Sequence, residues 1–352
     1  MDRRDAVRAL PFLIATPWLA AVEGVSTIIG TGSPGYSDRE VNNPYGVLVV
    51  RGVLYFCDLD NQRIRTLDLT SRKTIAIAGS GQRGYSGDAG PATAASLNMP
   101  HEIQFDSAGH LFIVERDNHA VRRVDGRTGT ISTIAGTGTA GFTGDHGPAV
   151  HAQLRSPHSI VFTPDGRLLI CDVGNHRIRR LDMHAGTIET YAGTGERGPT
   201  PDGARLHGTP LNGPRTLAFD ERGNLYVALR EGNAIYRIAM QAGTIHHVAG
   251  TGEMGYSGDN GPARKATFAG PKGLAYARGR LYVADTENHV IRRIDLRTGV
   301  ITTVLGTGQR GDGPEPHPLQ CSLSRPHGVF ADASGAVYVG DSEAHRIRVV
   351  RD

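Results

Sequence analysis

The sequence is poor in cysteine, in aromatic residues and in clustered charge. It has three cysteines, Cys57, Cys171 and Cys321, and this odd, low count argues against a disulfide framework. Aromatic residues make up 6% and charged residues 21% of the 352 residues, and the net charge is +3. No run of five to eight Lys or Arg residues occurs. The composition therefore argues against a nucleic-acid-binding protein.

Long hydrophobic runs are also scarce. The apolar stretch "ALPFLIATPWLAAV" at residues 9–22 is too short to span a bilayer comfortably and contains two prolines. It follows Arg3 and Arg4 and ends in small residues, which is typical of an export signal. The paired arginines resemble a twin-arginine signal, although the residues after them depart from that pattern. We therefore expect residues 1–24 to be a signal-like segment of a periplasmic or secreted protein without a stable membrane span.

Glycine and proline, by contrast, are plentiful, with 47 and 19 residues, and they predict many tight turns. The prolines reveal an internal repeat. Those that open "PYGV", "PHEI", "PHSI", "PRTL", "PKGL" and "PHGV" follow one another at intervals of 56, 57, 57, 57 and 55 residues: Pro44, Pro100, Pro157, Pro214, Pro271 and Pro326. Six copies of one unit therefore fill the chain after the N-terminal segment.

Each unit contains short apolar stretches with period-two alternation, separated by turns, which predict four antiparallel strands. Six such sheets around an axis form a propeller. The last unit ends at Asp352 after its third strand, whereas "STIIGTG" from Ser26 is a fourth strand without a unit. We predict that residues 25–30 complete the sixth sheet. Residues 25–352 would then form an all-β, six-bladed β-propeller of four-stranded antiparallel blades, closed by the N-terminal strand.

Two recurring motifs carry a family resemblance. The turns "DVGNHRIRRLD" and "DTENHVIRRID" resemble the NHL repeat, and the linkers of the form "AGTGxxGYSGDxGPA" resemble its bacterial exported version. The resemblance covers nearly all of the chain after the N-terminal segment. It implies a six-bladed propeller, but it implies no activity, because this fold hosts many functions.

The residue after each repeated proline is expected at one mouth of the central channel. This ring position reads Tyr45, His101, His158, Arg215, Lys272 and His327. The long linkers and the turns between second and third strands belong to the same face, which makes it the expected ligand site. Four further histidines lie in the repeated "NH" turn, where we expect them to stabilise the turn: His119, His176, His289 and His345.

The three ring histidines suggest a metal site. Imidazole is a common zinc ligand, and three histidines plus water form an open catalytic site. The Pro-His start of an inner strand also resembles the metal-binding histidines of peptidyl-hydroxyglycine amidating lyases, which are six-bladed propellers with zinc in the channel. That resemblance implies His101, His158 and His327 as ligands of a divalent, zinc-type ion. It implies acid–base or anion-binding roles for Tyr45 and Arg215. The alternative is that histidine is a polar residue tolerated at a wet channel mouth.

Glu115 replaces the aspartate that four other units carry at the same position. We expect it beside His101 on the neighbouring strand, where a carboxylate could orient a ligating imidazole or act as a general base. The alternative is a conservative exchange within a turn.

The fourth unit departs most from the repeat. It carries Arg215 in the ring, Ala228 where the other units have Asp or Glu, and then Arg230. Together with Lys272, these arginines would give the mouth a positive wall that favours a carboxylate, sulfate or phosphate ligand.

Two functions follow from these patterns. The first is a recognition module, monomeric and without enzymatic activity, that presents its loop-rich face to a protein, a glycan or a small anion. The second is a metal-dependent lyase or hydrolase that acts on a small anionic substrate at the channel mouth. RNA binding, a third possibility, is disfavoured by the signal-like segment and by the absence of a basic patch. Of these functions, we expect that of a recognition module.

Overall fold

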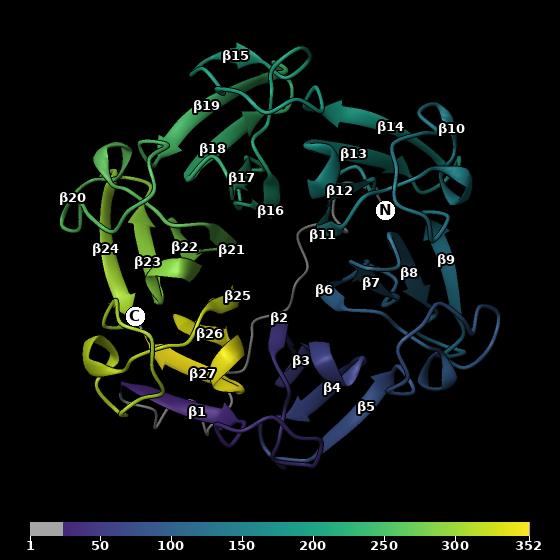
Figure 1. Ribbon diagram of the computed structural model, residues 1–352, viewed down its shortest axis with the longest axis horizontal. Helices are drawn as coiled ribbons and strands as arrows, with labels where there is room; N and C mark the ends of the chain where they lie inside the picture. Colours follow the sequence, from purple (N-terminus) through teal and green to yellow (C-terminus); the bar gives the residue numbers. More distant parts are fainter. Residues whose placement is uncertain (1–23, 352) are drawn as a thin grey trace, which may run out of the picture.

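The computed structural model describes residues 24–351, which form six antiparallel sheets around a central channel (Figure 1). Three sheets have four strands, and three gain a two-residue fifth strand from the preceding linker. The predicted all-β, six-bladed propeller is therefore confirmed. The signal-like segment falls almost entirely outside the described residues.

Each blade starts at the channel with the strand that opens on the repeated proline. These inner strands are β2 (Pro44–Val50), β6 (Pro100–Phe105), β11 (Pro157–Phe162), β16 (Pro214–Phe219), β21 (Pro271–Ala277) and β25 (Pro326–Ala331). The second strands are β3 (Val53–Asp58), β7 (Leu111–Glu115), β12 (Leu168–Asp172), β17 (Leu225–Leu229), β22 (Arg280–Asp285) and β26 (Ala336–Asp341). We number the blades one to six in this order.

The outer half of each blade contains a third and a fourth strand. The third strands are β4 (Arg63–Asp68), β8 (Ala120–Val124), β13 (Arg177–Asp182), β18 (Ala234–Ala239), β23 (Val290–Asp295) and β27 (Arg346–Arg351). The fourth strands are β5 (Thr74–Ala78), β9 (Ile131–Ala135), β14 (Thr187–Ala192), β19 (Thr244–Ala249), β24 (Val300–Leu305) and, in blade six, β1 (Val25–Ile29).

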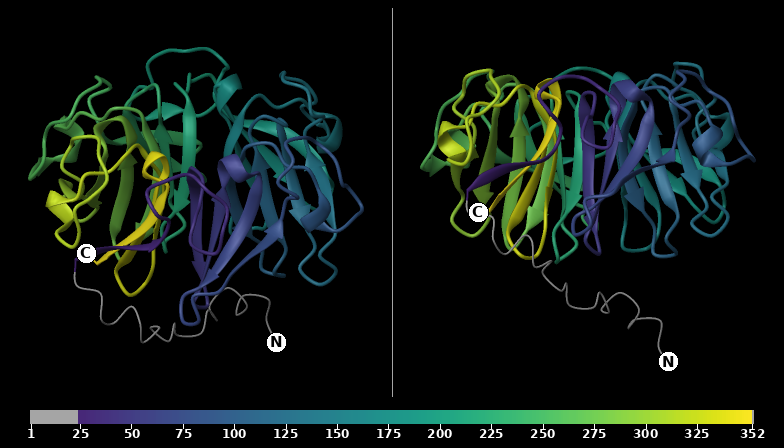
Figure 2. Two further views of the ribbon diagram at one scale, coloured as in Figure 1. Left: turned by 60° about the horizontal axis from the view of Figure 1, so that its bottom comes forward. Right: turned by 90° about the horizontal axis from the view of Figure 1, so that it is seen from below.

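The N-terminal strand closes the ring. β1 pairs antiparallel with β27, with Val25 opposite Val350, so that the two ends of the chain share one sheet. Figure 2 shows β1 beside the last strands of the chain. This confirms the predicted closure, which removes two exposed sheet edges at once.

The core lies between neighbouring blades. Residues of blade three such as Leu169 and Ile178 pack against Leu217 and Val227 of blade four, and all four are at most 4% exposed. Both faces of each sheet are therefore buried, which explains the apolar runs of the second strands. The three cysteines are free and buried in these layers.

A hydrogen bond links each blade to the next at the point where the inner strand begins. The backbone N–H of Ser156, the residue before Pro157, donates to Nδ1 of His119 in blade two at 3.1 Å. The other five pairs, each with its acceptor first, are Gln62 with Met99, His176 with Gly213, Asn233 with Gly270, His289 with Arg325 and His345 with Asn43. All twelve residues have positive φ, between 44° and 70°. The turn histidines thus have a structural role, as expected, but their recorded Nδ1 bonds join the following blade and not residues of their own turn.

A second repeated feature is a buried ion pair. Arg179 on β13 is fully buried, lies 3.3 Å from Asp172 at the end of β12, and reaches Asp145 of the linker at 2.7 Å. Four other blades have the same pair: Arg65 with Asp58, Arg122 with Glu115, Arg292 with Asp285 and Arg348 with Asp341. Through these contacts, the arginines connect the linkers to the ends of the second strands.

Blade four replaces this ion pair with uncharged residues. The register pairs Pro214 with Leu229, as it pairs Pro157 with Asp172, so Leu229 occupies the acidic position. Tyr236 stands in place of the arginine and donates its hydroxyl to the Thr200 carbonyl at 2.9 Å. The sequence comparison that put Ala228 at this position was wrong by one residue, because the turn sequence that marks the register in the other units is altered here.

The bond between blades yields a first prediction. In His119→Ala, the Ser156 N–H loses its acceptor and a residue without a polar side chain must adopt positive φ. We expect a loss of about 1–2 kcal/mol in unfolding free energy. His119→Asn should retain most of the stability, because asparagine has this role at position 233. Thermal unfolding of both variants measures this, and equal losses in the two would contradict the assigned role.

Blade four suggests a second prediction. Asp172→Leu alone leaves the Arg179 guanidinium without its buried partner, and we expect a loss of about 3 kcal/mol or more. Adding Arg179→Tyr reproduces the residues of blade four, so the double variant should be more stable than Asp172→Leu. Chemical denaturation of the two single variants and the double variant gives the coupling. A double variant whose loss equals the sum of the single losses would refute this interpretation.

Candidate functional site

The six ring positions meet at one mouth of the channel. The rings of His327 and Tyr45 stack with centroids 4.0 Å apart, Tyr45 contacts His101 edge-on at 4.4 Å, and His101 contacts His158 edge-on at 4.4 Å. Arg215 Nη2 lies 3.4 Å from His101 Nδ1. The second-to-third-strand turns lie on the same side, because the register sets each repeated proline opposite the end of the second strand. The ring proposed from the sequence is therefore one contiguous cluster.

The ring is buried although it lies at a mouth of the channel. His101, His158, Arg215, Lys272 and His327 are between 3% and 7% exposed. Their side chains are thus shielded from bulk solvent, and charges among them interact more strongly than surface charges would.

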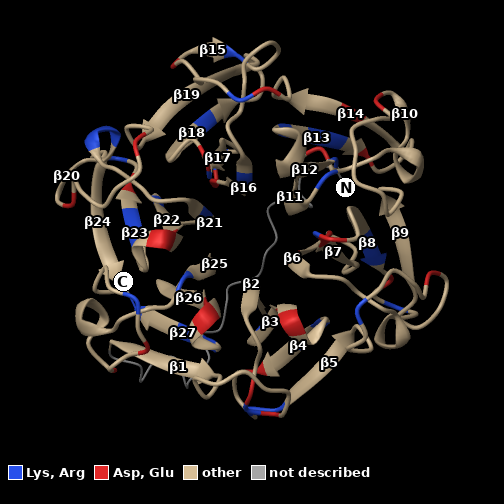
Figure 3. Cartoon of the chain, in the orientation of Figure 1, with Lys and Arg blue, Asp and Glu red and all other residues tan. Residues whose placement is uncertain are grey.

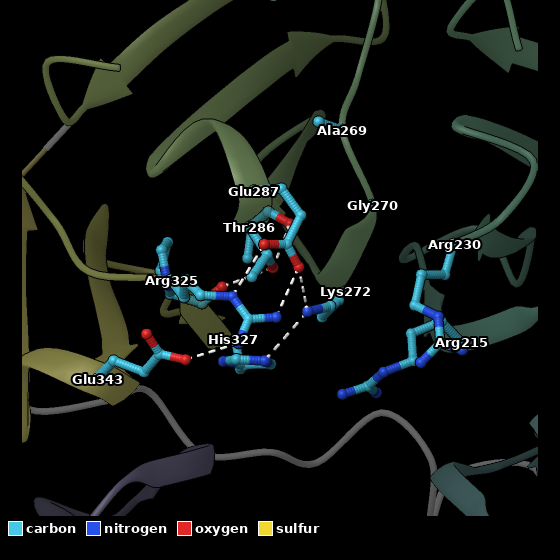
Figure 4. Close-up of polar contacts among 12 residues, drawn as sticks. Arg215, Arg230, Ala269, Gly270, Lys272, Thr286, Glu287, Arg325, His327 and Glu343 are labelled. Atoms are coloured by element: carbon cyan, nitrogen blue, oxygen red, sulfur yellow. Dashed lines mark hydrogen bonds and ion pairs between the residues drawn. The ribbon is translucent and has the colours of Figure 1, made fainter. Parts of the chain in front are cut away.

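Lys272 and His327 belong to a polar network on the side of blades five and six (Figure 4). Lys272 Nζ donates to Glu287 at 2.7 Å and lies 3.3 Å from His327 Nε2, and the Tyr45 hydroxyl lies 3.0 Å from the same nitrogen. Arg325 pairs with Glu287 on the other side. Burial lowers the pKa of Lys272 to about 8, while Glu287 acts in the opposite direction, so the ammonium is the main form at neutral pH.

The three ring histidines are neutral. Burial, together with the positive charge of Arg215, holds the pKa values of His101 and His158 well below 6.5, and burial and Lys272 do the same for His327. His158 Nδ1 lies 2.6 Å from the Ser156 carbonyl, so this nitrogen carries the proton and Nε2 is an acceptor. Neutral imidazoles can donate or accept hydrogen bonds without adding charge.

Arg215 is a buried cation that forms no recorded ion pair within residues 24–351, although the charge of Glu102 opposes the effect of burial on its pKa. Within residues 24–351 the structure records no carboxylate at ion-pair distance from its guanidinium, and its Nε has no hydrogen-bond partner. Burial lowers its pKa to about 10, which still leaves the group protonated at neutral pH. The fully buried arginines of the third strands, by contrast, each pair with a carboxylate. An isolated buried charge is costly, so Arg215 is poised to bind an anion.

Two cavities adjoin the ring. A channel cavity of about 240 Å³ is lined by ring residues, Arg215 and Lys272 among them, and by the inner strands beyond them. A mouth cavity of about 410 Å³ lies over blades two to four and is lined by Arg116, Arg197 and Arg230. Arg215 therefore lines the channel cavity, and Arg230 lines the mouth cavity. Figure 4 shows these two arginines on blade four, next to Lys272 of the neighbouring blade five.

The positive wall expected from Arg215, Arg230 and Lys272 is largely neutralised. Arg230 pairs with Glu231 and Lys272 with Glu287. Figure 3 shows acidic residues in the turns around the channel. Of the three predicted cations, only Arg215 lacks a carboxylate partner in the part of the chain described.

Glu115 has structural contacts. Its carboxylate accepts hydrogen bonds from the Asn98 N–H at 2.8 Å and from Arg122 at 3.1 Å, and it also bonds Asn118. These are the contacts of the aspartates in the other blades, and none of those recorded involves His101. The position therefore fits a conservative exchange within a turn, and its contacts give no support to an acid–base role.

The residues of the ring do not fit a metal ion. Within residues 24–351, no three His, Cys, Asp or Glu side chains are grouped so that they could hold one. The Arg215 guanidinium lies against His101 and the Lys272 ammonium against His327, so a dication would be placed beside two positive charges. A zinc-type site at His101, His158 and His327 stays a prediction without support from this arrangement.

Glu102 is a site residue that the sequence reasoning missed. It lines the channel cavity and accepts a hydrogen bond from the Ser159 hydroxyl at 2.8 Å. Burial raises its pKa to about 7. The signal was present in the repeat, because the same position in the other blades carries only glycine, serine or threonine: Gly46, Ser159, Thr216, Gly273 and Gly328.

Comparisons with known proteins support the repeat assignment. A Teneurin NHL domain model matches residues 92–182, and an NHL repeat model matches residues 268–294 and 323–350. The chain is 28% identical over 299 residues to "Protein SUPPRESSOR OF QUENCHING 1, chloroplastic" of Arabidopsis thaliana, covering 78% of this chain and 27% of that protein. It is 25% identical to human "NHL repeat-containing protein 2", covering 92% of this chain and 41% of that protein. The chain thus spans less than half the length of either relative.

A solved structure shares the fold. An "auxiliary nutrient binding protein" from Bacteroides thetaiotaomicron superposes with a TM-score of 0.66 at 15% identity, covering 93% of this chain and 75% of that chain. At this identity the similarity concerns the fold alone.

Among the described residues, no helix is long and apolar enough to cross a membrane.

The neutral ring histidines generate a prediction of pH dependence. The pKa of His158 is lowered from 6.5 by folding, so the unfolded chain binds more protons than the folded chain at acidic pH. Keeping His158 neutral therefore lowers the free energy of unfolding only at acidic pH. The full stability is present above pH 6.5 and is lost as the pH falls below that value. His158→Asn should therefore flatten the fall in Tm between about pH 7.5 and about pH 5. Melting curves for both proteins measure the effect, and equal slopes would contradict it.

Proposed function

We propose that this NHL-repeat propeller is a ligand-binding module that holds a small anion in its channel, at the ring of residues that follow the repeated prolines. The observation that carries the proposal is Arg215, a guanidinium 3% exposed and without a carboxylate partner among the described residues. A bound carboxylate, phosphate or sulfate would supply the missing counterion, and an arginine can contact such a group with two parallel hydrogen bonds.

The other ring residues would orient the anion. Lys272 adds a second positive charge, which Glu287 partly compensates. The neutral imidazole of His101, which contacts Arg215, can offer a hydrogen bond without competing for the negative charge. The cavity of about 240 Å³ suits a small molecule.

A neighbouring structure and the geometry of the ring both bear on the choice between the candidate functions. The neighbouring structure described as a nutrient-binding protein has the same fold, and we draw from it only the expectation that such a channel can serve binding. The metal-dependent lyase or hydrolase has no comparable support, since the histidines lie against two cations. Export to the periplasm or the exterior remains a proposal supported by the sequence of residues 1–24.

The role of Arg215 is tested by Arg215→Met. In the absence of a binding anion, we expect this variant to have a higher Tm than the wild type, because it removes an unpaired buried charge. Acetate or phosphate, compared with chloride at equal ionic strength, should raise the Tm of the wild type and leave that of Arg215→Met unchanged.

Arg123→Met is the matched control. Arg123 is partly exposed on β8 and pairs with Asp125 away from the channel, so this variant should retain the full anion-induced increase in Tm. An Arg215→Met variant that keeps the increase would refute the proposed function.

A further inference from the structure

The channel cavity contains an unpaired carboxylate as well as an unpaired guanidinium. Glu102 on β6 lines the same cavity as Arg215 on β16, and its recorded side-chain partner is the Ser159 hydroxyl. Within residues 24–351, no Lys or Arg nitrogen is recorded at ion-pair distance from Glu102. The two opposite charges therefore line one cavity without forming an ion pair with each other.

Against the effect of burial, the charge of Arg215 and the backbone N–H of Ile160 lower the pKa of Glu102, and the other groups near it bring no positive charge. His101 is neutral, and burial raises the pKa values of the nearby thiols Cys57 and Cys171 well above their usual range, so these groups carry no charge at neutral pH. Lys272, the other cation of the cavity, is bound to Glu287. A ligand with only a negative group would satisfy Arg215 and leave Glu102 without a cation.

We propose that the ligand of the channel cavity is zwitterionic, a small amino acid or ω-amino acid whose carboxylate binds Arg215 and whose ammonium binds Glu102. This inference rests on the proposed function, since it uses Arg215 as the anion anchor. It adds the second anchor and thereby the chemical class of the ligand.

The walls of the cavity suit such a molecule. Beyond the ring, the inner strands contribute Leu217, Leu274 and Val329, which can pack against methylene groups between the two charged ends. The position of Glu102 in the repeat is occupied by glycine in three blades, so one carboxylate stands among small neighbours. A single amino group can therefore approach it from the cavity.

The protonation of Glu102 provides a signature of this binding mode. Because burial raises its pKa to about 7, the free protein holds a proton on Glu102 part of the time at neutral pH. An ammonium group stabilises the ionised carboxylate, so binding of the zwitterion should release protons. The groups that face Glu102 are Ser159, Arg215, His101, Cys57 and Cys171, and none of them is expected to take up these protons near neutral pH.

The experiment compares matched ligands by calorimetric titration of the wild type near neutral pH. The pairs are glycine with acetate, β-alanine with propionate, and γ-aminobutyrate with butyrate. We expect at least one amino acid to bind about tenfold or more tightly than its monocarboxylate partner. Its observed enthalpy should vary with the ionisation enthalpy of the buffer, which reports proton release.

Glu102→Gln should abolish both the preference and the proton release, while its affinity for monocarboxylates should be equal to or greater than that of the wild type. Glu189→Gln, which makes the same exchange on β14 at a carboxylate that pairs with Arg180 and does not line this cavity, should keep the preference. Equal binding of the two members of every pair by the wild type would overturn the zwitterion proposal, as would an equal loss for both in Glu102→Gln.

The two proposals fail in different ways. If monocarboxylates bind through Arg215 without any gain from an amino group, only the zwitterion is excluded. If no ligand of any pair binds while phosphate still raises the Tm through Arg215, the zwitterion is likewise excluded and the anion site stands. If Arg215→Met binds anions as the wild type does, the anion site itself is refuted and the zwitterion proposal with it.

Discussion

The position of every ring residue depends on the hydrogen bond that joins consecutive blades. The N–H of the residue before each repeated proline donates to a side chain in the turn of the preceding blade, and both residues have positive φ. This bond fixes the point at which the inner strand begins. The residue after the proline is thereby directed to the channel mouth in all six blades, so residues about 57 positions apart in sequence, such as His101 and His158, come into ring contact. The same interaction that orders the blades therefore assembles the candidate site.

Buried charge in this propeller falls into two classes. The buried arginines of the third strands, such as Arg179, each pair with a carboxylate of their own blade, and the uncharged Leu229 and Tyr236 fill the same space in blade four. These charges are part of the structure. Arg215 is buried and Glu102 is half-buried; both line one cavity and lack such partners among the described residues. Since isolated buried charges destabilise a fold, their presence indicates a requirement other than stability.

The sequence predicted the repeat, the number of blades, the ring closure and the six ring residues, because all of these follow from a period that six copies share. It did not predict the contacts of individual side chains. Glu115 lies on the strand next to His101, as expected, yet its carboxylate is bound to Asn98 and Arg122. Arg230 has a counterion because Glu231 is the next residue in the chain. Whether Arg215 has one depends on all the side chains around the channel. Such differences are set by three-dimensional packing, which a repeat alignment does not contain.

The neutral state of the ring histidines follows from the same balance of charge. Arg215 and burial keep the imidazoles unprotonated, and this leaves the guanidinium as the dominant charge on its side of the ring. An anion bound to Arg215 would weaken its effect on His101 and His158 and would raise their pKa values. The neutral imidazoles would then become more basic and hence better hydrogen-bond acceptors when a ligand is present. Around them, Arg230 and Lys272 already pair with Glu231 and Glu287, so the selectivity of the channel cavity rests on the few charges that form no ion pair.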